Sequence, residues 1–434
     1  MRAFLKITKN QAIPAGIAGA YLLLASLYAL WKIPSGLGNT QMDYYPQYAQ
    51  ALLAGKFWLT PMDALQNCPH DLSGYDGHCY VYWGIIPALL HVIFPFLSDR
   101  LVALFASTIA IYFLNRLLLD LARACSDEKI SLLKNALPFC LALSLVSGFG
   151  VLGLVGRVYE ESLAVATALG LIGLTLARPY LWGDKVNFAS LKLLGSVLAF
   201  CAAGLTRIPW FLCGMMTGIF LLVSHSQRTP PPLRMAQLKR LLGLGVVFLA
   251  AISIQLLINF LRFGNLMETG YSLQTTQVNM APWLESHPGV FSLRYLPYNA
   301  IIYWITGFKE FFLEEGILLQ KLMKHCYYRE FPAGLLVWMP SLLLFFFVSR
   351  KSLPRKQLFT MSVSLLPLAV PALLLSFQIF RYQWEAFAFG AVPISAILIA
   401  RNPHPILAWG LLWWTGWISL TQWNEILTLL KDTL

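Results

Sequence analysis

Residues 241–260, LLGLGVVFLAAISIQLLINF, form a long apolar stretch without one charged side chain. About 20 helical residues cross a hydrocarbon core of about 30 Å, because an α-helix satisfies all of its backbone polar groups internally. The stretch therefore predicts a transmembrane helix. Of the 434 residues, 58% are hydrophobic and only 12% are charged, unlike an ordinary soluble protein. The composition indicates an all-α integral membrane protein.

Similar stretches recur from one end of the chain to the other, and they predict a polytopic bundle of about eleven transmembrane helices. We expect one transmembrane domain over residues 1–434, with no separate soluble domain and with the first apolar stretch retained as an anchor. The predicted spans are 12–31, 101–122, 136–155, 161–178, 189–206, 208–225, 241–260, 332–348, 358–378, 386–400 and 404–421.

The net charge of +12 is interpreted as membrane topology and not as nucleic-acid binding, because basic residues collect in cytoplasmic loops. With the amino terminus inside, every predicted inner loop is basic. This assignment requires 81–97 to be an interfacial or re-entrant helix on the outer side. We therefore expect a multi-pass protein of the inner (plasma) membrane, with its active site on the extracytoplasmic (periplasmic) face.

Two long segments, 32–99 and 261–331, then lie outside, and long ordered loops on a rigid scaffold commonly carry function. Residues 41–59, QMDYYPQYAQALLAGKFWL, predict an amphipathic interfacial helix that Gly55 ends. Residues 309–329 predict a second interfacial helix.

Asp43 is the first candidate catalytic residue. It follows the first predicted span by about a dozen residues and precedes the aromatic amphipathic stretch. A carboxylate at such a place can act as general base and take the proton of an acceptor hydroxyl. Asp is also a preferred helix N-cap residue, and the residues alone favour the two roles equally.

The loop 67–84, NCPHDLSGYDGHCYVYWG, holds His70, Asp71, Asp76 and His78. Asp71 is the second candidate for the catalytic base, and His70 is a candidate substrate contact. A divalent metal is an alternative use of these four side chains, but their spacing matches no established ligand pattern. We expect no cofactor.

Cys68 and Cys79 flank the same loop. They can form a disulfide in an oxidising compartment, and two free thiols are the alternative.

Charged residues at the outer ends of predicted spans complete the candidate site. Guanidinium groups suit the phosphate of a lipid-linked sugar, although they can also extend to lipid headgroups. Carboxylates there can orient substrate or simply cap helices and turns. The predicted substrate and phosphate contacts are Arg157 and Glu160 in GRVYEES, Arg207 in LTRIPW, Arg262 and Glu268 in NFLRFGNLMETGYSLQ, and Arg381 with Tyr382 in FRYQWEAF.

Together these motifs resemble the GT-C superfamily of membrane glycosyltransferases, including bacterial proteins similar to protein mannosyltransferases (glycosyltransferase family 39). The resemblance covers most of the chain and rests on the order and shared outer placement of the motifs. It implies a helical bundle with interfacial helices over an outer cavity, a polyprenyl-phosphate sugar donor and inverting transfer. It also implies that Asp43 is the base. Many relatives have a paired acidic motif there, whereas this chain has Met42 and Tyr44 around Asp43, so Asp71 stays an alternative.

The chemistry needs few residues. A phosphate leaving group requires no general acid, so one carboxylate on the acceptor side and cations on the donor side suffice. The expected partners are the polyprenyl-phosphate sugar, an extracytoplasmic acceptor (glycan, lipid or protein) and membrane lipids, without nucleic acid. A secondary transporter or lipid flippase is the main alternative, although such proteins carry ionisable groups near the membrane midplane and often internal repeats. A non-catalytic subunit of a cell-envelope assembly complex is the third.

Overall fold

The computed structural model divides the chain into two compact units, which are described separately below. The first unit comprises Met1–Ile33, Ser107–Leu154 and Phe291–Asp432, and the second comprises Pro34–Ala106 and Val155–Val290 with the last two residues. The structure describes residues 9–33, 35–38, 43–61, 68–69, 72–125, 136–182, 191–228, 231–274, 291–305, 335–340, 342, 355–374, 380–401 and 405–429.

The described residues are mainly helical, and four helices are long and apolar enough to cross a membrane. They are Gln11–Lys32 of α1 (Lys9–Lys32), α4 (Asp99–Ala124), α7 (Val158–Leu181) and Met235–Phe263 of α10 (Pro231–Phe263). A fifth span results if α5 (Leu137–Val146) and α6 (Phe149–Val155), which meet at a 45° bend, are counted as one. The membrane character expected from composition is therefore supported, but a total of eleven spans is not established.

Exposed apolar side chains on α10 show why water is the wrong solvent for this helix. Leu242, Val246 and Leu249 are 58%, 65% and 62% exposed. Leucine and valine repeated at this spacing form a continuous stripe along one face of a helix. Such a face is suited to contact with lipid chains.

The named elements of the first unit that the structure describes are all helices. Helix α5 packs on α18 (Phe380–Ala400) and α19 (Pro405–Leu429), and α1 also contacts α5. The Tyr21 hydroxyl of α1 donates a hydrogen bond to the Phe149 carbonyl at 2.9 Å. The remaining elements of this unit are η4 (Leu293–Tyr295), α12 (Leu296–Ile305), α15 (Leu335–Trp338), α16 (Arg355–Leu365), η6 (Leu366–Leu368) and α17 (Ala369–Leu374).

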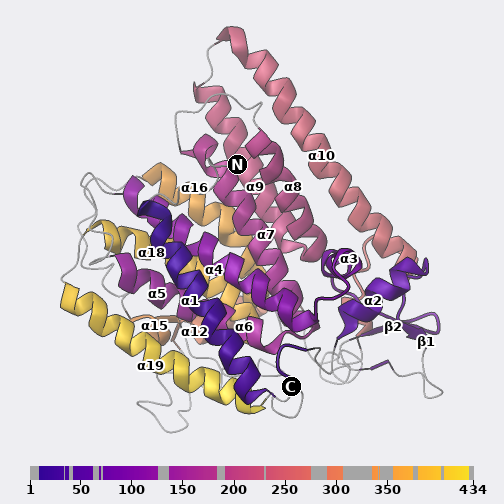
Figure 1. The fold of residues 1–434 in the computed structure, drawn as a ribbon. Coiled ribbons are helices and arrows are strands. Elements are labelled where there is room, and N and C mark those ends of the chain that lie inside the picture. The colour runs from indigo at the N-terminus through magenta and orange to yellow at the C-terminus, as the bar shows by residue number, and fades with distance from the viewer. Residues whose placement is uncertain are drawn as a thin grey trace. The chain divides into compact units, whose positions relative to one another are not determined.

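Four helices of the second unit lie side by side as a bundle (Figure 1). Helix α7 packs on α8 (Leu191–Thr206) and α9 (Pro209–Arg228), and α10 packs on α8 and α9. The short helix η3 (Tyr271–Leu273) follows the end of α10. All of the candidate residues that the structure describes, apart from those of α18, belong to this unit.

The amphipathic helix predicted from residues 41–59 is present as α2 (Tyr44–Leu53). It buries Tyr44, Tyr45 and Tyr48, and Gly55 follows its end with a φ of 72°, in the left-handed region that favours glycine. The stretch 81–97 contains α3 (Ile86–Ile93), which has only 8 residues. Such a helix is about 12 Å long and is too short to span, as the predicted topology requires.

A small antiparallel sheet lies between α2 and α3 in the sequence and was not expected. Its strands are β1 (Thr60–Pro61), β2 (Ser73–Tyr75) and β3 (His78–Tyr80), in the order β1–β3–β2. Asp76 and Gly77, with φ of 46° and 71°, connect β2 to β3. Ser73 also forms an isolated β-bridge with Gln274, so the two long segments predicted to lie outside meet at this sheet.

Candidate functional site

Aromatic side chains from both long segments that were predicted to lie outside gather in one buried cluster of the second unit. Helix α2, the segment around β3, the start of α7 and the end of α10 each contribute to it. The members used below, called the aromatic cluster, are Tyr44, Tyr45, Tyr48, Tyr80, Tyr82, Trp83, Tyr159 and Phe263. Asp43, Arg157, Glu160 and Arg262 lie on or directly before helices that contribute to the cluster.

Arg262, in the last turn of α10, enters the aromatic cluster and is only 2% exposed. One guanidinium nitrogen donates to the Tyr48 hydroxyl at 2.6 Å, and the other donates to the Trp83 carbonyl at 3.2 Å. The guanidinium carbon also lies 5.2 Å from the centre of the Tyr48 ring. Among the described residues, no carboxylate forms an ion pair with Arg262. Its buried charge is therefore held by neutral groups.

Arg207 approaches the same tryptophan from another helix. It follows the end of α8, is 6% exposed, and its guanidinium carbon lies 5.5 Å from the centre of the Trp83 ring. Trp83 therefore contacts Arg207 through its ring and Arg262 through its carbonyl. The structure thus brings two predicted phosphate contacts, which are far apart in the sequence, to one residue.

The backbone after Trp83 is fixed against the end of α8. The Gly84 amide donates to the Thr206 carbonyl and the Ile85 amide donates to the Leu205 carbonyl, both at 3.2 Å. A Cβ on residue 84 would lie 2.0 Å from the Leu205 carbonyl oxygen. Only glycine permits this approach, so Gly84 is required to hold Trp83 beside Arg207.

Arg157 and Glu160 form a local pair at the start of α7, with 3.4 Å between Nη2 and Oε1. Both side chains are buried. The hydroxyl of Tyr159, between them in the sequence, accepts a hydrogen bond of 2.7 Å from the Tyr82 hydroxyl, and the Tyr159 ring centre lies 4.7 Å from that of Trp83. The pair therefore borders the aromatic cluster, and the two residues neutralise each other within one helical turn.

Asp43 precedes the first residue of α2, at the N-cap position, but its side chain makes no capping hydrogen bond. Instead, Oδ1 accepts a hydrogen bond of 2.6 Å from Nε2 of Gln47. The residue is partly exposed. Tyr48, which contacts Arg262, lies on the same helix about 7.5 Å farther along its axis. The Asp43 carboxylate therefore does not cap α2, which was one of the two roles that the sequence left open.

Glu268 has a local structural role. Its two carboxylate oxygens accept hydrogen bonds from the Gly270 amide at 2.7 Å and from the Ser272 hydroxyl at 2.8 Å. The positive φ of Gly270, 81°, agrees with the tight turn expected after α10. The geometry matches the simpler alternative, in which this segment is a helix-terminating turn.

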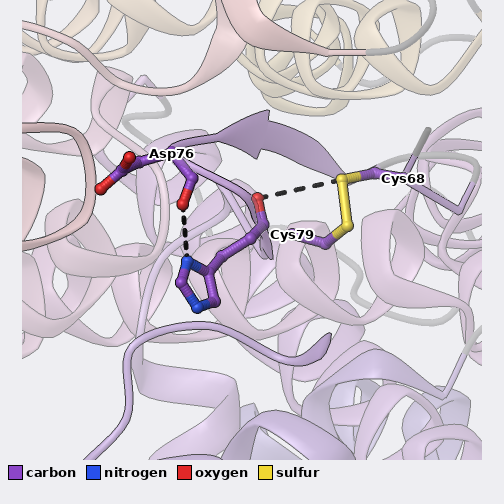
Figure 2. The surroundings of a disulfide bond; sticks show 4 residues. Cys68, Asp76 and Cys79 are labelled. Carbon is purple, nitrogen blue, oxygen red and sulfur yellow. Dashed lines mark hydrogen bonds between the residues drawn. A yellow bond between two sulfur atoms is a disulfide. The ribbon is translucent and has the colours of Figure 1, made fainter. Parts of the chain in front are cut away.

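Cys68 and Cys79 form a disulfide, which settles the alternative that the sequence left open (Figure 2). Beside it, Nδ1 of His78 makes a 2.8 Å hydrogen bond with the Asp76 carbonyl, and the Trp58 ring centre lies 4.5 Å from that of His78. The His78 imidazole thus takes part in packing the hairpin. Within the described ranges, no group of three His, Cys, Asp or Glu side chains is placed to bind a metal ion.

A buried ion pair between α3 and α7 was missed by the sequence analysis. His91 Nε2 lies 3.0 Å from Oε1 of Glu161, and the two side chains are 3% and 0% exposed. Burial lowers the pKa of His91, but the hydrogen bond and charge of Glu161, together with the charge of Asp99, raise that pKa by more, so the net shift is upward. Glu161 was visible in the motif GRVYEES, whereas His91 lies in an apolar stretch, 70 residues earlier.

Tyr45 is a further buried member of the aromatic cluster. Burial, and secondarily the negative charge of Glu161, hold the pKa of Tyr45 well above its ordinary value, while Arg262 has a smaller opposite effect. Tyr45 therefore stays protonated at any physiological pH. The buried charged side chains of this unit include Arg157, Glu160, Glu161, Arg207 and Arg262, together with His91.

The remaining candidates are not placed by the structure. His70 and Asp71 lie outside the described residues, as does the predicted interfacial helix at 309–329. Arg381 and Tyr382 belong to α18, and their side chains are outside the description. No protein-family model matches the chain, and no curated protein or solved structure matches it either.

Proposed function

We propose that the protein is a membrane glycosyltransferase that transfers a sugar from a polyprenyl-phosphate donor to an extracytoplasmic acceptor, with inversion at the anomeric carbon. The proposal rests on the site residues and on the resemblance of the sequence to GT-C enzymes. No match to a known protein contributes to it.

The charge of Arg262 is the observation that carries the proposal. A buried cation without a counter-ion is costly, since desolvation of one ion costs several kcal/mol even after relaxation. Arg262 is held only by a hydroxyl, a carbonyl and a ring among the described residues. These partners leave its positive charge available to an anion, and Arg207 beside Trp83 adds a second cation. Arginine is especially suited to binding a phosphate group.

Asp43 is the proposed base. In the proposed step, an acceptor hydroxyl gives its proton to the Asp43 carboxylate while its oxygen forms a bond to the anomeric carbon. The bond between that carbon and the phosphate oxygen breaks, and polyprenyl phosphate leaves with the electron pair. Arg262 and Arg207 stabilise the charge that develops on the phosphate. No general acid is needed, and attack opposite the leaving group inverts the anomeric centre.

Both guanidinium groups are covered by protein in this conformation. The donor phosphate therefore reaches them only when covering groups move aside. Helix α2, which carries Tyr48, is the proposed moving element, because it is short and amphipathic and begins at the proposed base. Closure of such an element over a substrate excludes water from the reaction.

The Cys68–Cys79 disulfide supports an extracytoplasmic position for the site, because disulfides persist in oxidising compartments. The basic inner loops predicted from the sequence support the same orientation. The proposed location is therefore the inner (plasma) membrane, with the site on its outer side.

The test uses purified wild type, Asp43→Asn and Arg262→Lys in detergent, each supplied with radiolabelled polyprenyl-phosphate sugars and with candidate acceptors. We expect transfer by the wild type and a rate about 10²- to 10⁴-fold lower for Asp43→Asn, the usual contribution of a general base. Asp43→Asn should still bind polyprenyl phosphate. Arg262→Lys keeps the charge but loses the planar pair of donors, and it should bind the donor more weakly.

Equal turnover by wild type and Asp43→Asn would exclude Asp43 as the base and would leave Asp71 as the candidate base. Absence of donor binding and turnover in all three proteins would favour the transporter or subunit alternatives. Asp120→Asn is the matched control, because Asp120 lies on α4, where its carboxylate forms local ion pairs with Arg116 and Arg123. Its activity should equal that of the wild type.

A further inference from the structure

We propose that His91 and Glu161 are positioning residues for the Arg262 site, and that the proton they share sets the pH range in which the site binds a phosphate. This inference rests on the proposed function. It concerns a pair that the proposed transfer step does not use.

The pair is a direct side-chain link between α3 and α7. His91 is in the last turn of α3 and Glu161 is in the first turn of α7, with 3.0 Å between Nε2 and Oε1. Both side chains are buried. Since an ionisable residue within a membrane-spanning helix is costly unless it has a partner or a task, Glu161 needs an explanation. Cohesion alone does not supply one, because an apolar pair would hold two helices equally well.

The segment between the pair and the Arg262 site is fixed at both ends. At its start, Gly84 and Ile85 bond to the end of α8. At its end, His91 is held on α7 by Glu161. Trp83, directly before this segment, provides the carbonyl that Arg262 binds and the ring that Arg207 faces. A shift of α3 on α7 therefore moves the residue on which both cations converge.

A second route joins the pair to Arg262 through α2. Helix α2 packs on α3, which carries His91, and the Tyr48 hydroxyl of α2 accepts a hydrogen bond from Arg262. The position of α3 therefore also affects the helix that holds the guanidinium group. Both routes end at Arg262.

The proton on His91 determines whether the pair is an ion pair. The titratable and charged groups that act on His91 are Glu161 on α7 and Asp99 at the start of α4. Tyr45 on α2 is a neighbour of Glu161, and the hydrogen bonds from this segment to α8 are between backbone groups. Because the folded-state pKa of His91 is raised, its stabilising contribution is complete below the unfolded pKa. It is lost as pH rises through the folded pKa.

The experiment measures the binding of polyprenyl phosphate in detergent micelles by wild type, His91→Gln, Glu161→Gln and the control Asp120→Asn. The pH is varied upward from 6, which is near the ordinary pKa of histidine, about 6.5, to 9. Glutamine at residue 91 keeps an N–H donor for Glu161 but does not titrate. We expect wild type and Asp120→Asn to lose about tenfold in affinity as pH rises, the equivalent of one charge-assisted hydrogen bond. His91→Gln should stay at the weak alkaline value throughout, and Glu161→Gln should also bind weakly at every pH.

The inference would be overturned if the affinity of His91→Gln for polyprenyl phosphate still fell as pH rises, or if Glu161→Gln bound as tightly as wild type at every pH. Melting temperatures of the same proteins over the same pH range need no ligand. The wild-type value should fall with rising pH and that of His91→Gln should stay constant. If wild type binds no polyprenyl phosphate at any pH, the proposed function fails. The melting temperatures then decide whether the pair links the two helices, and a pH-independent wild-type value would refute that link.

Discussion

Replacement of Arg262 by methionine tests whether this arginine is buried for stability or for function. Methionine fills much of the same volume without a charge. The change removes the hydrogen bonds to the Tyr48 hydroxyl and the Trp83 carbonyl, at 2.6 and 3.2 Å, and the contact with the Tyr48 ring. It also removes a cation that has no ion-pair partner among the described residues.

These effects on the free energy of unfolding have opposite signs and similar magnitudes. Two hydrogen bonds from a charged donor contribute about 3–6 kcal/mol, and the cation–π contact contributes about 1 kcal/mol. Burial of the uncompensated charge costs several kcal/mol. We therefore expect the free energy of unfolding of Arg262→Met to lie within about 2 kcal/mol of the wild type. Donor binding should nevertheless weaken about 10- to 100-fold, because one guanidinium–phosphate interaction of about 1.5–3 kcal/mol is lost.

Tyr48→Phe is the matched variant. It removes one acceptor and leaves the guanidinium group buried with fewer partners, so it should lower the free energy of unfolding by about 1.5–3 kcal/mol. The assay is denaturation in detergent, together with polyprenyl-phosphate binding measured for each protein. A loss of more than about 4 kcal/mol in Arg262→Met, with donor affinity unchanged, would refute the reasoning and assign Arg262 a structural role.

Two further predictions concern the framework of the site. Gly84→Ala places a Cβ 2.0 Å from a backbone oxygen and should lower the free energy of unfolding by about 3 kcal/mol. The control Gly243→Ala, whose added Cβ meets no atom within 4 Å, should be neutral or stabilising by up to about 1 kcal/mol. Equal melting temperatures for the two variants would contradict the packing argument. The double variant Cys68→Ser, Cys79→Ser removes a disulfide with a sequence separation of 11, and its free energy of unfolding should be about 3 kcal/mol lower. If the melting temperature stays unchanged in this variant and in the reduced wild type, the disulfide does not stabilise the fold.

Patterns with a local physical cause predicted the structure well. The amphipathic pattern and Gly55 gave α2 and its end, since both follow from neighbouring residues. Long apolar runs predicted α4, α7 and α10, because length and composition alone decide whether a helix can span. The number of spans does not follow from the same pattern. Helix α8, for example, has only 16 residues, and a short apolar helix can also be buried in protein.

Tertiary pairs were beyond local patterns. His91 lies in the apolar stretch HVIFPF, and nothing near it in the sequence shows that Glu161 is its partner. The convergence of Arg207 and Arg262 on Trp83 also depends on helix packing. One missed feature did have a local signal: Asp76-Gly77 is a strong signature of a two-residue hairpin turn, but strands of three residues are too short to show alternation.

The contact between the two outer segments has a consequence for biosynthesis. The Ser73 hydroxyl bonds to the Gly270 carbonyl, 197 residues later, and Ser73 pairs with Gln274. At about 5–20 residues per second, the ribosome needs roughly 10–40 s to make the intervening chain. During that delay the hairpin is without its later partner. The Cys68–Cys79 bridge closes a short loop, so an oxidase can lock the hairpin before the rest of the polypeptide is translated.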